Sequence, residues 1–171
     1  MAIDFNKLSE KFDPSEIEWR IQQAGVTNDG KPWAMVLAYL TSRAVQQRLD
    51  DVCGPTNWQN HFIVESDQAI SCGVSIYDEE KKEWITKWDA ADATDIEAIK
   101  GGRSGAMKRA CVHWGIGRYL YYLEATFAEC ITDKPPVGEK GLWHKHYDKE
   151  KKLGFFWKTP LMPKWATPGA R

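Results

Sequence analysis

Apolar and polar side chains alternate most regularly in residues 69–77. Every second position there is apolar, and the positions between are small or polar; the apolar ones are Ile70, Cys72, Val74 and Ile76. A period of two is typical of a strand that buries one face. The charged stretch 78–83 predicts a turn and residues 84–88 predict the returning strand, so the middle of the chain should form an antiparallel meander.

Residues 8–25 predict a short amphipathic helix. Asp13 has the side chain of an N-cap, Pro14 suits the first helical position, and Gly25 follows as a stop signal. Ile17 and Ile21 stand four positions apart, so a helix would place them on one face.

Residues 32–52 combine an apolar run with a helical pattern. The run 32–40 predicts a buried strand, which leads directly into a helix over residues 41–52. Gly54 and Pro55 supply both usual signals for the end of that helix.

A second helical pattern extends from about Thr94 to Trp114. Its apolar stripe consists of Ile96, Ile99, Met107, Ala110, Cys111 and Trp114. Gly101 and Gly102 each cost about 1 kcal/mol relative to Ala inside a helix, so we expect this helix to be kinked or to start later.

The last forty residues are rich in Trp, Lys and Pro, and they predict a hairpin of residues 143–147 and 153–158 followed by an irregular tail. Together these elements predict an α+β fold. A chain of 171 residues needs only one core, so we expect a single domain over residues 1–171, with the basic C-terminal hairpin and tail at 134–171.

Composition narrows the class of protein. No stretch approaches the ~18 apolar residues of a membrane span, and the first residues are polar and charged, so a cytoplasmic protein is expected. The four cysteines are scattered without the spacing of a zinc site or a disulfide framework, which favours thiols packed as small hydrophobic groups: Cys53, Cys72, Cys111 and Cys130.

The net charge of −1 conceals a strong asymmetry. Residues 1–99 hold 9 Lys and Arg against 18 Asp and Glu, a net charge of −9, whereas residues 100–171 hold 14 against 6, a net charge of +8. A molecule polarised in this way can bind a polyanion on one face while remaining nearly neutral overall.

Catalytic patterns are weak. The four histidines show no local arrangement with a nucleophile, and there is no phosphate-binding loop. His144 and His146 would share a face of a strand and could bind a metal, but Lys145 stands between them without a nearby thiol or acidic motif, which favours a solvated hairpin. An acidic series could hold magnesium for a nuclease or serve instead as helix caps: Asp89, Asp92, Asp95 and Glu97.

The cations and aromatic residues favour a nucleic-acid ligand. Nine Trp is a high number, several stand beside Lys or Arg, and about two of them are expected at a ligand or subunit interface. On a helix, Lys100, Arg103 and Lys108 could form a positive stripe opposite the apolar side, with Arg109 at its edge or bonded to a neighbouring strand. A solvated helix face without a partner is the alternative.

Three blocks of the sequence resemble the Rad52 superfamily of single-strand annealing proteins, in its phage and bacterial branch. The first block is residues 39–54 followed by Asn57-Trp58, the second is the strand 73–76 with its partner, and the third is residues 100–115 with Met-Lys-Arg-Ala and Trp-Gly. The resemblance covers roughly residues 12–125.

The resemblance implies a β-β-β-α core that assembles side by side into a ring or arc. Single-stranded DNA would lie in a positive groove and pair with its complement during recombination and repair, without ATP, a cofactor or a metal. The family's DNA-contacting Lys-Arg pair falls on Lys108 and Arg109, and a further basic position falls on Lys100. An exonuclease or a single-strand-binding protein is a candidate partner, and no membrane is involved.

The sequence also departs from the family pattern. The family's groove arginine in the first block falls on Ala44, and Arg43, one place earlier, is the candidate to replace it if the helix is rotated. A third basic position falls on Val112. Other cations are then candidates for the groove: Arg48, Arg103 and Arg118. Two alternative functions remain open: protection of DNA ends without annealing, and a magnesium-dependent nuclease that uses Asp89, Asp92 and Asp95.

Overall fold

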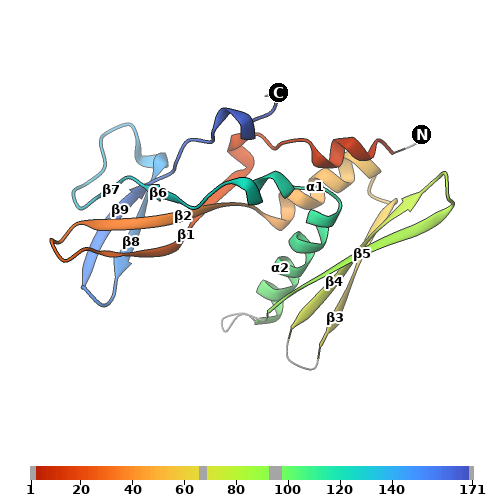
Figure 1. Ribbon diagram of the computed structural model, residues 1–171, viewed down its shortest axis with the longest axis horizontal. Helices are drawn as coiled ribbons and strands as arrows, with labels where there is room; N and C mark the ends of the chain where they lie inside the picture. The colour runs from red at the N-terminus through yellow and green to blue at the C-terminus, as the bar shows by residue number, and fades with distance from the viewer. Residues whose placement is uncertain (1–2, 66–68, 93–97, 170–171) are drawn as a thin grey trace.

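The computed structural model describes residues 3–65, 69–92 and 98–169, and within them the fold is α+β, as predicted. It has three antiparallel three-stranded sheets and two α-helices, and the helices lie between the β3-β4-β5 sheet and the β1–β2 hairpin (Figure 1). In chain order these elements are β1 (Ile17–Val26), β2 (Pro32–Leu40), α1 (Ser42–Cys53), β3 (Trp58–Val64), β4 (Ile70–Asp78), β5 (Glu83–Ala91), α2 (Ala98–His113), β6 (Thr126–Ala128), β7 (Cys130–Ile131), β8 (Trp143–Asp148) and β9 (Leu153–Lys158).

The predicted meander is confirmed as the sheet β3-β4-β5, and both helices pack on one face of it (Figure 1). The alternating apolar residues of β4 are all buried in the same cluster as Val45 and Leu49 of α1 and Ala106 and Ala110 of α2. Neither helix in the described part of the chain has the length and apolar character needed to cross a bilayer.

α2 lies close against this sheet because small residues face it. A Cβ at Gly105 would lie 3.2 Å from the Cβ of Ala91 in β5, so the glycine permits a close approach of helix and strand. The indole Nε1 of Trp114 donates to the carbonyl oxygen of Val74 at 3.0 Å, which fastens the end of α2 to β4. The helix passes through Gly101 and Gly102 without interruption, and the predicted start at Thr94 lies outside the described residues.

The prediction of a helix over residues 8–25 was wrong, because residues 17–26 form strand β1. The capping signals at Asp13 are real, but they cap a single 3₁₀ turn, Pro14–Glu16, whose capping box is complete. The four-residue separation of Ile17 and Ile21 fits a period of two as well as a helical period, and pairing with β2 selects the strand.

β2 and α1 form as predicted. The Thr41 hydroxyl accepts a hydrogen bond from the amide of Ala44 at 3.1 Å and caps the start of α1. Gly54 ends the helix with a φ of 83°, in the left-handed region that favours glycine.

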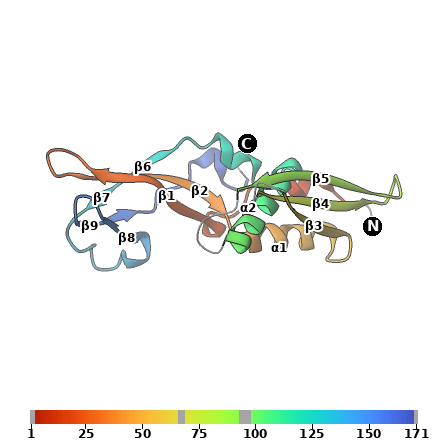
Figure 2. The ribbon, with the colours of Figure 1, turned by 90° about the horizontal axis from the view of Figure 1, so that it is seen from below.

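The predicted C-terminal hairpin is confirmed as β8 and β9, which join β7 in a third sheet. Figure 2 shows this hairpin on one side of the β1–β2 hairpin. Between the two lies a second buried cluster, formed by Ala34, Val36, Phe155 and Trp157. The β1-β2-β6 sheet is therefore covered on one face by the C-terminal hairpin.

Candidate nucleic-acid interface

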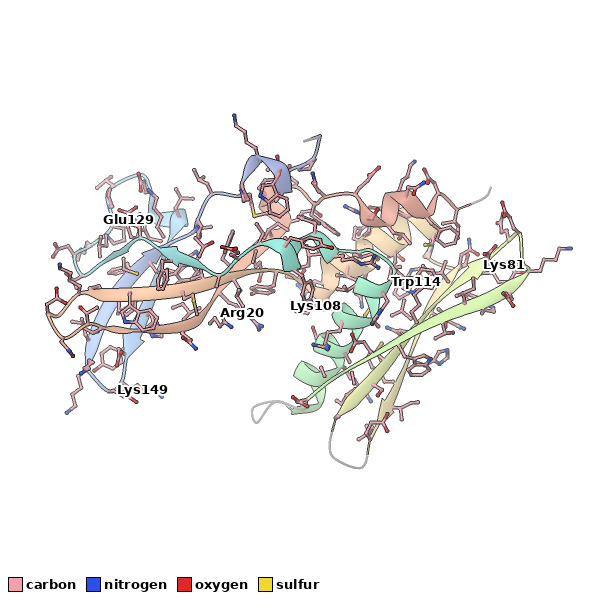
Figure 3. All side chains as sticks on the ribbon, in the orientation of Figure 1. Arg20, Lys81, Lys108, Trp114, Glu129 and Lys149 are labelled. Carbon is pink, nitrogen blue, oxygen red and sulfur yellow. The ribbon has the colours of Figure 1, made fainter. Side chains whose placement is uncertain are left out.

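Lys108 lies where α2 meets the β1–β2 hairpin, together with Arg20 of β1 (Figure 3). The Lys108 Nζ is 5.2 Å from the centre of the Tyr39 ring, and the guanidinium carbon of Arg20 is 5.4 Å from the same centre. We call the group of Glu18, Arg20, Tyr39 and Lys108 the basic corner.

The register of the β1–β2 hairpin builds this corner. Glu18 is opposite Tyr39, and Arg20 is opposite Leu37, so all four side chains share one face of the sheet. The Tyr39 hydroxyl donates a hydrogen bond of 2.6 Å to Oε2 of Glu18, which fixes the ring beside the two cations. One carboxylate thus accompanies two positive charges.

Burial and mutual repulsion perturb the groups of the corner. Burial lowers the pKa of Lys108, the positive charge of Arg20 lowers it further, and Glu18 opposes both effects. Burial and the hydrogen bond to Glu18 raise the pKa of Tyr39 to about 12. Lys108 is therefore a cation held in an unfavourable position, and a bound anion would stabilise its charged form.

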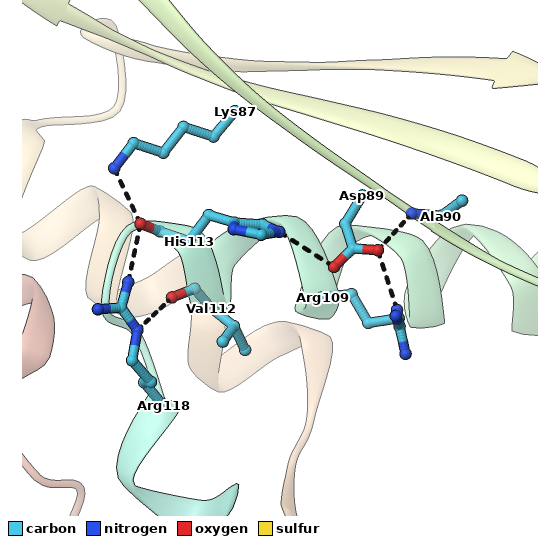
Figure 4. Close-up of polar contacts among 7 residues, drawn as sticks. All are labelled: Lys87, Asp89, Ala90, Arg109, Val112, His113 and Arg118. Carbon is cyan, nitrogen blue, oxygen red and sulfur yellow. Dashed lines mark hydrogen bonds and ion pairs between the residues drawn. The ribbon is translucent and has the colours of Figure 1, made fainter.

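Arg109, the next residue, faces a different strand (Figure 4). Its Nε donates to Oδ1 of Asp89 in β5 at 3.1 Å, and the ring Nε2 of His113 lies 3.2 Å from Oδ2. Burial alone would raise the pKa of Asp89, but the hydrogen bonds from Ala90 and Arg109 outweigh it and lower that pKa. The sequence left two possibilities for Arg109, the edge of the positive stripe or a bond to a neighbouring strand. The structure shows the second.

Arg118 and Lys87 bind the carboxyl end of α2 (Figure 4). Arg118 donates from Nε to the carbonyl oxygen of Val112 and from Nη2 to that of His113, both at 2.9 Å. Lys87 Nζ donates to the same His113 carbonyl at 2.8 Å and lies 4.3 Å from the ring centre of Trp114. Cations here complete the last hydrogen bonds of the helix and favour its dipole.

The other predicted cations are dispersed. Arg48 donates from Nη1 to the carbonyl oxygens of Lys7 and Glu10, at 3.2 and 2.7 Å, and lies 3.9 Å from the ring centre of Phe12. It therefore fastens the N-terminal segment onto α1. Arg43 is exposed on α1, and the side chain of Lys100 lies outside the described residues.

The predicted positive stripe is divided between two flanks of α2. Arg103 lies 5.5 Å from the ring centre of Phe62 in β3, whereas Lys108 lies over Tyr39. Five residues of helix rotate a side chain by about 140°, which accounts for the separation. The structure brings Lys108 together with Arg20, not with Arg103.

Sequence reasoning missed Arg20 and Tyr39 as members of one site. Tyr39 was part of the first resemblance block, but its partner strand was predicted as a helix, so the register that joins Glu18 and Arg20 to it was hidden. Predicting residues 17–26 as a strand would have placed Glu18 and Arg20 beside Tyr39.

His144 and His146, which could have held a metal, pack on aromatic rings of strand β9. His144 stacks on Trp157 with ring centres 4.4 Å apart, and its Nε2 is 2.8 Å from the Thr159 hydroxyl; His146 packs on Phe155. Across residues 3–65, 69–92 and 98–169, no three His, Cys, Asp or Glu side chains gather as a metal site. Asp95 and Glu97 lie outside that part of the chain.

Comparison with known proteins supports the family resemblance of the three sequence blocks. The profile described as Rad52/22 family double-strand break repair protein matches residues 5–136. The single-stranded DNA-binding protein DdrA of Deinococcus radiodurans is 30% identical over 164 residues, which are 95% of this chain and 66% of that protein.

The protein of the same name from Deinococcus deserti is 30% identical over 119 residues, 68% of this chain and 56% of that protein. The chain thus spans less than two thirds of the length of each of these relatives. No solved structure matches it significantly.

Proposed function

Because the chain belongs to the Rad52/22 family of double-strand break repair proteins, we propose that it binds single-stranded DNA and pairs complementary strands without a nucleotide cofactor. The observation that carries the proposal is the basic corner, where Lys108 and Arg20 flank Tyr39 with only one carboxylate. The relatives named as single-stranded DNA-binding proteins support the choice of ligand.

The corner suits a phosphate better than a base edge. Lys108 is partly desolvated and repelled by Arg20, so a phosphate between the two cations would relieve the repulsion and stabilise the charged lysine. Contacts of this kind fix the strand without reading its sequence. Bases whose backbone is held in this way keep their pairing edges free to meet a complementary strand, which is what annealing requires.

We propose that copies of the chain assemble side by side, so that one modest corner is repeated along a strand. The sheet face of β3-β4-β5 that points away from the helices supports this proposal. It carries large side chains that no described element covers: Ile63, Trp84 and Trp88 are 48%, 43% and 45% exposed. Exposed apolar patches of this kind typically mark contacts between proteins.

A second candidate function is end protection, in which the assembly covers single strands without pairing them. It is supported by the relatives, which are named for binding of single-stranded DNA and not for annealing. We further propose that the chain is not an enzyme, since both carboxylate oxygens of Asp89, the best described candidate for a metal ligand, are occupied by Arg109 and His113.

The test mixes two complementary labelled oligonucleotides with and without the protein, in magnesium buffer without nucleotide, and measures duplex formation, strand length and the mass of the assembly. Faster pairing by a large assembly with intact strands is the expected result. Tight single-strand binding without faster pairing would replace annealing by end protection, and shortened strands would revive the nuclease. Failure to bind would overturn the proposal.

A further inference from the structure

Strand β2 is apolar on both faces but is buried on only one. Ala34 and Val36 are fully buried against the C-terminal hairpin, as expected for the covered face of an antiparallel sheet. The alternate side chains of the same strand are only half-buried: Trp33, Met35, Leu37 and Tyr39. Such a face is normally polar, so these side chains are not explained by the core.

The register of the sheet defines this surface, which we call the open face. A bulge at Gln22 keeps the alternation of β1 in step with β2, so that Gln23 lies opposite Met35 and Gly25 opposite Trp33. Phe127 of β6 lies on the other side of Met35. The open face consists of Glu18, Arg20, Gln23, Gly25, Trp33, Met35, Leu37, Tyr39 and Phe127.

Trp33 and Phe127 form the far end of the open face. Their ring centres are 6.2 Å apart in an edge-to-face arrangement, and Phe127 is 69% exposed. The indole of Trp33 lies against Gly25, where a Cβ would come within 3.1 Å of Nε1. The glycine therefore lets the indole lie close over the backbone of β1.

The open face is continuous with the basic corner, since Glu18, Arg20 and Tyr39 belong to both. Trp33 is six residues from Tyr39 along β2, which is about 20 Å of strand. A strand whose phosphates are held by Arg20 and Lys108 can thus continue over Met35 to the two rings. Apart from Glu18, which accepts the Tyr39 hydroxyl, the strand positions that form this face carry no carboxylate.

We infer that Trp33 and Phe127 form a base-stacking platform on the open face, which takes unpaired bases of the single strand held at the basic corner. The inference rests on the proposed function and adds a site for bases to a site for phosphates. Aromatic rings are suited to this because every base has a flat face to stack, so binding remains independent of sequence. The other possible occupant, a second copy of the chain, is excluded or established by the test.

The experiment compares binding of two labelled strands of equal length, oligo(dT) and an abasic strand with the same phosphates, to wild type, Trp33→Ala, Phe127→Ala and Lys108→Ala. Loss of a stacking side chain typically weakens binding by about five-fold to a hundred-fold per base. We expect Trp33→Ala and Phe127→Ala to show that loss on oligo(dT), with little change on the abasic strand and an unchanged salt dependence. Lys108→Ala should weaken binding to both strands and reduce the salt dependence.

Trp165→Ala is the matched control. Trp165 is an exposed tryptophan, 44% accessible, that lines a separate pocket with Trp19, whose side chain points to the covered face of the sheet. Its removal should not affect binding. Trp33→Phe keeps a ring and should keep most of the affinity, and Phe127→Ala tests the platform even if Trp33→Ala misfolds, because Phe127 is already largely exposed.

Several outcomes would overturn the inference. Equal losses on both strands, or no loss on oligo(dT), would mean that the rings do not stack on bases. A smaller assembly in the Trp33 and Phe127 variants, measured without DNA, would assign the open face to contacts between copies. If wild type binds neither strand, the proposed function and the platform fail together; if wild type binds and the ring variants bind equally well, the platform alone fails.

Discussion

Two neighbouring residues of α2, Lys108 and Arg109, have different environments because a helix turns each residue by about 100°. Lys108 is half-buried over Tyr39, whereas Arg109 is exposed and paired with Asp89. Only the first lies in the basic corner. Charge counted along the sequence therefore overstates the charge available to a single ligand.

The lowered pKa of Lys108 predicts how binding depends on pH. A lysine with a lowered pKa loses its proton, and with it the attraction for phosphate, at a lower pH than an ordinary lysine does. We expect single-strand affinity to begin to fall at a pH below the ordinary lysine pKa of about 10.4, and Lys108→Arg to remove this early fall because arginine stays charged. Fluorescence anisotropy titrations of a labelled single strand, repeated at several pH values for wild type and Lys108→Arg, measure this dependence.

Lys158→Arg is the control for that titration. The hydrogen bond to Glu139 raises the pKa of Lys158, so this lysine stays charged over the same range. If Lys108→Arg and Lys158→Arg change the pH dependence of binding equally, Lys108 is not its cause. Tyr39, with a pKa raised to about 12, should stay neutral throughout.

Asp89 restrains Arg109, so its removal should change DNA binding. We expect Asp89→Asn to strengthen binding and to increase the salt slope by about 0.7, as one more cation becomes free for a phosphate. The exposed ion pair contributes only about 0–1 kcal/mol to folding, so stability should change little. Asp78→Asn makes the same change in net charge at a distant turn and should leave the slope unchanged.

Arg48 has a structural role, whereas Arg43 is exposed, so substitutions of the two should differ in their effect on stability. Arg48→Ala should lower the free energy of unfolding by about 1.5 to 3 kcal/mol, because it removes the charged hydrogen bonds to Lys7 and Glu10. Arg43→Ala should leave stability unchanged. Urea denaturation measures both; a larger cost for Arg43 would contradict the assignment.

At the scale of elements, the strands and helices that were predicted correctly are those in which the local sequence pattern and the tertiary packing agree. The meander, β2 with α1, and the C-terminal hairpin were predictable because alternation, capping and turn signals coincide in each. β1 was not predictable in the same way. The helix signals before it are satisfied by one 3₁₀ turn, and only pairing with β2 makes residues 17–26 a strand.

Gly73 tests the packing of the β4–β5 pair. A Cβ there would lie 2.6 Å from Cε2 of Trp88, which covers the glycine on the outer face of the sheet. Gly73→Ala should therefore lower the free energy of unfolding by about 1–3 kcal/mol, as overpacking does. Gly154→Ala, whose Cβ would meet Tyr147 at an ordinary 3.7 Å, should cost less. Thermal unfolding of both variants provides the comparison, and Trp88→Ala should relieve most of the penalty at Gly73.

At the scale of the whole molecule, the fold separates surfaces of different character. The basic corner and the open face lie on the β1–β2 side of α2, whereas the uncovered apolar face of β3-β4-β5 points away from both helices (Figure 1). The surface that we propose for contacts between copies is thus separate from the surface that we propose for DNA.

If copies assemble through the outer face of β3-β4-β5, a charge placed there should affect assembly more than it affects DNA binding at the basic corner. We expect Trp84→Lys to reduce the mass of the assembly and to slow annealing more than it weakens binding of a short single strand. Light scattering and the annealing assay measure the two effects. Thr86→Lys places a second charge on the same face of β5. An unchanged mass of the assembly in both variants would show that this face is not the interface.

The sequence by itself determined the α+β class, the central meander, the β2–α1 unit and membership of the family, because these depend on local periodicity and on the spacing of short blocks. Only the tertiary structure decided that residues 17–26 are a strand, that Arg20 rather than Arg103 accompanies Lys108, and that the apolar residues of β2 divide into a buried face and an open one. The physical reason is common to all three: side-chain direction depends on strand register and helix rotation, and both are fixed by partners distant in the sequence.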